Sequence, residues 1–133
     1  METSGEVLLV GGCVSLTYGF LLGIPLSATR MRSPVASRHL VTAHLAAIVQ
    51  GAILVALSSA MHESDLPSGL ETLAASALVA GAVLFVAGAV ANWLQAVGDH
   101  FAARSLGWKL LAASGPINVI AIVIVLVGIV RGR

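Results

Sequence analysis

The residues of this sequence best suited to chemistry are a histidine and several amides that lie inside apolar segments. His44 occurs in the segment TAHLAAIVQGAIL, where Ala47, Ile48 and Gly51 share its face of a helix. An imidazole beside such a small, apolar surface can ligate the iron of a planar macrocycle. The alternative is a histidine that hydrogen bonds to a neighbouring backbone carbonyl.

Gln50 follows His44 by six positions in the same segment. Six residues turn a helix by about 240°, so Gln50 does not lie on the face that carries His44. Its amide is predicted to act in an adjacent cavity or in a site shared between subunits. The alternative is a hydrogen bond between helices.

A third polar group occurs in the segment NWLQAVGD. Asn92, Gln95 and Asp99 stand at positions zero, three and seven, a spacing that predicts one helical face, and Trp93 lies beside them. Asn92, Trp93 and Gln95 are therefore predicted to line a polar, substrate-binding cavity, with Asp99 as a catalytic candidate. The alternative for Asp99 is a solvated helix end.

The elements that position these residues follow from the distribution of charge. The chain has 133 residues, of which 58% are hydrophobic and 10% charged, with a mean hydropathy of +1.00. A soluble domain carries about 25% charged residues, so this sequence cannot coat a water-facing surface. Four stretches without a formal charge, residues 7–29, 39–62, 72–98 and 110–130, are each long enough to cross a bilayer, which needs roughly 20 apolar residues.

The sequence therefore predicts an all-α integral membrane protein, an antiparallel bundle of four transmembrane helices. Its helices are expected at about residues 7–28, 40–61, 71–98 and 109–130 of a single domain that spans residues 1–133. Small residues that recur every four positions in these stretches favour close helix packing. A bundle of this size has little interior, so it is expected to form homo-oligomers.

Composition also excludes several classes of function. A net charge of +1 argues against a nucleic-acid partner, which requires a basic stripe. Cys13 is the single cysteine, which excludes an internal disulfide, a CxxC redox pair and covalent haem attachment through CxxCH. Of the minor candidates, Tyr18 is predicted to pack in the bundle, and Asn118 to satisfy backbone groups freed by Pro116.

The basic residues also predict an orientation. The first and third loops hold five of the seven: Arg30, Arg32, Arg38, Arg104 and Lys109. Basic residues favour the inner side of a membrane. The sequence therefore predicts a multi-pass protein of the cell (inner) membrane with both termini outside, although Arg131 and Arg133 at the C-terminus oppose this orientation.

The segment TAHLAAIVQGAIL resembles the second-helix motif of a family of small four-helix membrane isomerases that includes styrene oxide isomerase and hydroxylaminobenzene mutase. The family pattern is a His, a polar amide six residues later and then Gly, which here corresponds to His44, Gln50 and Gly51. The usual amide is Asn, so Gln50 departs by one methylene. The segment NWLQ also resembles a third-helix motif of this group.

The resemblance implies a homotrimer that holds haem b, without a covalent bond, at subunit interfaces. It assigns His44 as the axial ligand of the haem iron and Gln50 as the amide that orients the substrate oxygen. The iron would act as a Lewis acid on a small hydrophobic aromatic substrate, converting an arylhydroxylamine to an aminophenol or an epoxide to an aldehyde. The family's epoxide isomerase uses a third-helix tyrosine that this sequence lacks, and Asp99 is then a candidate proton shuttle.

The competing interpretation is a non-enzymatic membrane protein, either a partner subunit or a haem-binding electron carrier. An electron carrier usually has two axial ligands, whereas the sequence places only one histidine clearly inside a span.

Overall fold

The computed structural model describes residues 3–98 and 104–133, and it is helical over almost all of them. The helices are α1 (Thr3–Arg32), α2 (Arg38–Ala60), the short 3₁₀ helix η1 (Met61–Glu63), α3 (Ser68–Leu94) and α5 (Leu106–Arg131). No strand occurs in this described part of the chain. The all-α prediction is confirmed, and the four long helices are long and apolar enough to cross a membrane.

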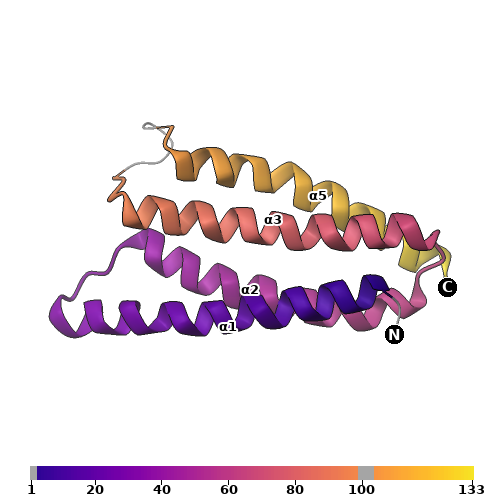
Figure 1. Cartoon of the computed structure of the whole chain (residues 1–133), viewed down its shortest axis with the longest axis horizontal. Helices are drawn as coiled ribbons and strands as arrows, with labels where there is room; N and C mark the ends of the chain where they lie inside the picture. Colours follow the sequence, from indigo (N-terminus) through magenta and orange to yellow (C-terminus); the bar gives the residue numbers. More distant parts are fainter. Residues whose placement is uncertain (1–2, 99–103) are drawn as a thin grey trace.

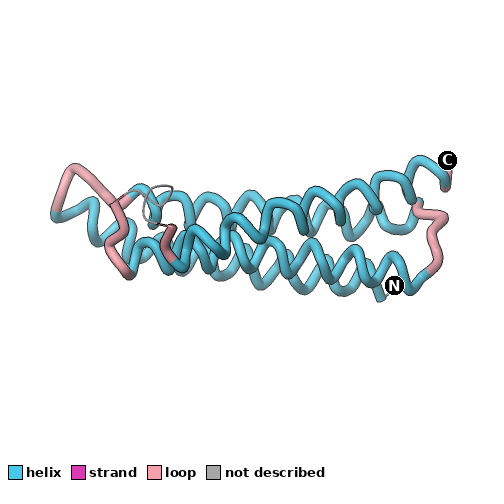
Figure 2. Tube along the Cα trace, turned by 90° about the horizontal axis from the view of Figure 1, so that it is seen from above, coloured by secondary structure: helices cyan, strands magenta, loops and turns pink. Residues whose placement is uncertain are grey.

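The four helices run back and forth along the long axis of the molecule (Figure 1). Both ends of the chain lie at one end of the molecule, and the α1–α2 loop lies at the other (Figure 2). Helix α1 packs most extensively on α2, and α3 on α5, while α3 also contacts α1 and α2. The molecule is thus two helical hairpins joined through α3, with α5 on the far side of α3 from α1 (Figure 1).

Glycines allow the two helices of each hairpin to approach closely. In the first hairpin, a Cβ atom on Gly12 would lie only 2.8 Å from the carbonyl oxygen of Gly51. In the second, a Cβ atom on Gly88 would lie 2.7 Å from the carbonyl oxygen of Gly107. Such contacts between small residues are typical of helices that associate in lipid, where no hydrophobic force drives the helices together.

The buried side chains form two separate clusters. One, near the ends of the chain, includes Leu8, Leu54 and Val125, and the other, nearer the α1–α2 loop, includes Leu22, Leu40 and Val86. Large apolar side chains also cover the outside of the molecule. An apolar surface of this extent, carried by four helices of membrane-spanning length, indicates a multi-pass membrane protein.

Helix α3 ends at Leu94, whereas the sequence predicted a helix to residue 98. Ala96 adopts a positive φ of 51°. The Ala96 N–H donates to the Trp93 carbonyl oxygen at 3.1 Å and the Val97 N–H donates to the Asn92 carbonyl oxygen at 3.0 Å. These two bonds form a Schellman motif, which closes the helix with an alanine where glycine is usual.

Candidate functional site

His44 is oriented by a backbone carbonyl of the neighbouring helix. It is half-buried on α2, and its Nδ1–H donates to the carbonyl oxygen of Gly19 on α1 at 2.7 Å. Because a carbonyl oxygen only accepts hydrogen bonds, this contact places the proton of the neutral ring on Nδ1 and leaves a lone pair on Nε2. Gly23 allows the ring to lie against α1, since a Cβ atom there would be 3.3 Å from His44 Cε1.

This geometry fits the axial ligand of a haem. Histidines that bind metals usually donate their other ring N–H to a carbonyl or carboxylate, which fixes the ring and its tautomer. Within the described ranges, no three His, Cys, Asp or Glu side chains gather to bind a bare metal ion. His44 lies on the seam between α1 and α2, and the clefts described below are lined by other residues.

Gln50 lines a different site, a cleft of about 250 Å³ between α2, α3 and α5. Its Oε1 atom is buried and has no hydrogen-bond partner within the described part of the chain. Asn118 of α5 lines the same cleft and packs so closely on Gly81 that any side chain at Gly81 would collide with its amide. An amide oxygen buried without a partner is costly in an apolar setting, so this cleft favours a ligand that donates a hydrogen bond.

One chain does not bring His44 and Gln50 to a common ligand. The His44 ring bonds to α1, whereas the Gln50 amide lines the cleft formed with α3 and α5. Within one chain the two side chains therefore face different neighbours.

Asn92 connects the end of α3 to the beginning of α5. Its side chain is fully buried, and its Oδ1 atom accepts a hydrogen bond from Ser105 Oγ at 2.6 Å. Ser105 in turn caps α5 by accepting the Trp108 N–H at 3.1 Å. The Nδ2 group of Asn92 is buried and finds no partner in the ranges described. These contacts give Asn92 a structural role in joining two helices.

Helix α3 does not extend over the whole of the predicted polar stripe. Because α3 ends at Leu94, Gln95 is the C-cap residue of the helix and is exposed. Trp93 is half-buried and packs against the cluster that contains Leu22 and Val86. Asp99 lies outside the described residues. The spacing of zero, three and seven places residues on one face only while the helix continues, and α3 ends at Leu94 with Gln95 as its C-cap.

Two residues that the sequence ranked low lie in clefts. Asn118 faces the cleft of Gln50, and Tyr18 lines a second cleft between α1 and α3. Both occupy the middle of their helices, as Gln50 does. This shared position at mid-depth is the signal by which the sequence could have indicated them.

Compared with protein-family models, curated proteins and solved structures, the chain matches none.

Proposed function

We propose that the chain is a subunit of a membrane-embedded isomerase that binds haem b through His44. The observation that carries this proposal is the hydrogen bond from His44 Nδ1 to the Gly19 carbonyl oxygen, which orients the ring and leaves Nε2 available as a ligand. The resemblance of the segment from His44 to Gly51 to the membrane isomerases supports the same assignment.

The proposed reaction is an intramolecular rearrangement of a small hydrophobic aromatic molecule. When bound, the haem iron supplies a Lewis acid for the oxygen of an arylhydroxylamine or an epoxide. The chain supplies binding and orientation. The Gln50 Oε1 atom, which lacks a partner among the described residues, accepts a hydrogen bond from the N–H or O–H of an arylhydroxylamine. An epoxide has no donor and would instead accept from the Nε2 group of Gln50.

The proposal includes a homo-oligomer, and a trimer follows the family resemblance. It is supported by the placement of His44 and Gln50, which face different neighbours within one chain. Substrates of this kind partition into the bilayer, which agrees with a site between apolar helices. We place the protein in the inner cell membrane, with the ends of the chain at its outer face.

The first test is an absorption spectrum of the protein purified in detergent after expression with ample haem. We expect a Soret band in the wild type that is lost in His44→Ala. His62→Ala is the matched control, because His62 is exposed beyond the end of α2, and it should retain the band. Protein that shows the band can then be assayed for turnover of aryl epoxides and arylhydroxylamines.

A wild type without a Soret band would refute the haem assignment, as would a band of equal intensity in His44→Ala. The alternative is then a non-enzymatic partner subunit. One observation favours that alternative, because the hydrogen bond from His44 to Gly19 also joins α1 to α2 without any cofactor. A spectrum typical of two axial ligands would instead indicate an electron carrier.

A further inference from the structure

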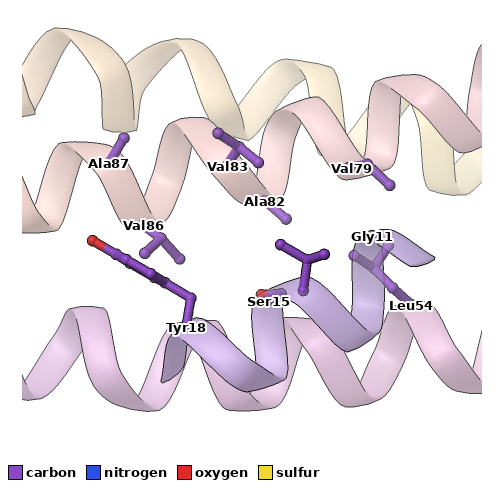
Figure 3. A pocket seen from close by; sticks show the side chains of 10 residues that line it. Gly11, Ser15, Tyr18, Leu54, Val79, Ala82, Val83, Val86 and Ala87 are labelled. Atoms are coloured by element: carbon purple, nitrogen blue, oxygen red, sulfur yellow. The ribbon is translucent and has the colours of Figure 1, made fainter. Parts of the chain in front are cut away.

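A second cleft opens between α1 and α3 (Figure 3). It shares Leu54 and Ala82 with the cleft of Gln50. Its volume is about 520 Å³, within the range of about 300–1,000 Å³ that is typical of small-molecule sites. Its walls are almost entirely apolar and include Val14, Val79, Val83 and Val86. The cleft can therefore hold a molecule of one or two rings.

A wholly apolar occupant of the cleft would leave the Tyr18 hydroxyl without a hydrogen bond. Tyr18 lies across the gap between the two helices and bounds one end of the cleft (Figure 3). The Ser15 hydroxyl, the other polar group of the lining, already donates to the Ala47 carbonyl oxygen at 2.9 Å. The Tyr18 hydroxyl has no such bond to any described residue.

The position of Tyr18 along α1 indicates which kind of molecule can occupy the cleft. Tyr18 stands near the middle of α1 (Thr3–Arg32), where neither water nor the hydrocarbon of lipid offers an acceptor. Tyr18 is 41% exposed, so its hydroxyl meets either an occupant of the cleft or lipid, and a polar group in lipid is costly without a hydrogen-bond partner. A lipid acyl chain would fill the cleft but would leave this hydroxyl unpaired. Apolar side chains of a second copy of the chain would leave it unpaired in the same way.

We infer that this cleft binds a flat, neutral molecule of one or two rings that enters from the bilayer and accepts a hydrogen bond from Tyr18 through a carbonyl or ether oxygen. The site requires neither haem nor His44, so its test is independent of the proposed isomerase activity.

The test compares two ligands that differ in one oxygen. In lipid nanodiscs, ¹⁹F resonances of 4-fluoroacetophenone and 1-ethyl-4-fluorobenzene report their binding, and empty nanodiscs correct for partition into lipid. We expect saturable binding of both ligands to the wild type, with the ketone bound more tightly. Tyr18→Phe should weaken the ketone by about 5-fold, the value of one hydrogen bond, and leave the hydrocarbon unchanged.

A pair of steric variants locates the site. Ala87 is exposed at the lining of the cleft near Tyr18, so Ala87→Leu should weaken saturable binding of both ligands by narrowing the cleft there. Ala80 is exposed on the same helix but does not line the cleft, and Ala80→Leu is the matched control that should bind as the wild type does.

Three results would overturn the inference. Absence of saturable binding to the wild type would mean that lipid fills the cleft. Equal affinity of Tyr18→Phe and the wild type for the ketone would show that Tyr18 does not donate a hydrogen bond to the ligand. Equal binding by Ala87→Leu and Ala80→Leu would place the ligands elsewhere.

Discussion

At the residue scale, His44 depends on the backbone of another helix for its orientation. Gly19 and Gly23 of α1 lie beside it, and each leaves room that a larger residue would occupy. The two glycines differ in what surrounds them. A Cβ atom on Gly19 would lie 3.0 Å from the backbone nitrogen of Ile48, whereas one on Gly23 would meet only the edge of the imidazole at 3.3 Å.

Gly19→Ala should therefore be more harmful than Gly23→Ala. The first substitution forces α1 away from α2 and moves the Gly19 carbonyl oxygen from His44, with an expected loss of about 1–3 kcal/mol in the free energy of unfolding. The second requires only a small rotation of the ring. Unfolding in mixed micelles measures the stability, and the Soret band measures the haem site. Equal stability of the two variants would show that the close contact at Gly19 is unimportant.

The same scale shows why sequence reasoning reached only part of the site. The chemical type and the apolar surroundings of His44 and Gln50 made them candidates. In the structure His44 bonds to a backbone carbonyl of α1, and Gln50 lines a cleft. The partner of His44 lies 25 positions earlier in the chain and that of Asn92 lies 13 positions later. No local pattern specifies such partners, so the contact of Asn92 with Ser105 was not predictable.

At the element scale, each hairpin is held by close contact between helix backbones. The contact of Gly88 with Gly107 joins α3 to α5. Neither backbone can yield locally, because the obstacle to a side chain at Gly88 is a carbonyl oxygen.

Gly88→Ala should lower the free energy of unfolding by about 1–3 kcal/mol, since the two helices must separate to admit a methyl group. Gly69→Ala, on the same helix, is the matched control. A Cβ atom there meets nothing within 4 Å, and alanine favours helix formation. Mixed-micelle unfolding distinguishes the two, and a Gly88→Ala protein as stable as Gly69→Ala would contradict this account of the hairpin.

Sequence patterns predicted the four helices more reliably than their ends. Long stretches without charge identify the helices because a lipid environment permits few alternatives. The end of α3 depends instead on tertiary contact. The segment from Gln95 to Val97, where the helix has already ended, contains no proline or glycine, and its Val97 carbonyl oxygen accepts the Nε2–H of His39 on α2 at 2.8 Å. That bond joins residues 58 positions apart, which no local pattern records.

At the scale of the whole molecule, the basic residues divide unevenly between its two ends. One end of the molecule carries five basic residues: Arg30 and Arg32 at the end of α1, Arg38 at the beginning of α2, Arg104 two residues before α5, and Lys109 in its first turn. The segment between α2 and α3, at the other end, carries Glu63 and Asp65. This asymmetry supports the proposed orientation, with the α1–α2 loop inside.

Cysteine labelling tests that orientation in a Cys13→Ser background. Val35 and Ser68 are both exposed, and they lie in the α1–α2 loop and at the beginning of α3. An impermeant maleimide added to intact spheroplasts should label Ser68→Cys and leave Val35→Cys unlabelled, while permeabilised cells should label both. The reverse pattern would contradict the proposed topology and show that Arg131 and Arg133 determine the orientation.

The loop between α2 and α3 has a consequence for the order in which the protein is made. Its Asp65 N–H donates to the Gly128 carbonyl oxygen at 3.1 Å, near the end of α5. Ser64 and Leu66 lie so close to Gly128 that a side chain there would not fit. The ribosome synthesises this loop before α3 and α5, so the contacts of the loop with Gly128 cannot form until α5 has been made and inserted. A nascent chain that stops after α3 therefore cannot form these contacts, and their formation reports that α5 has joined the other helices.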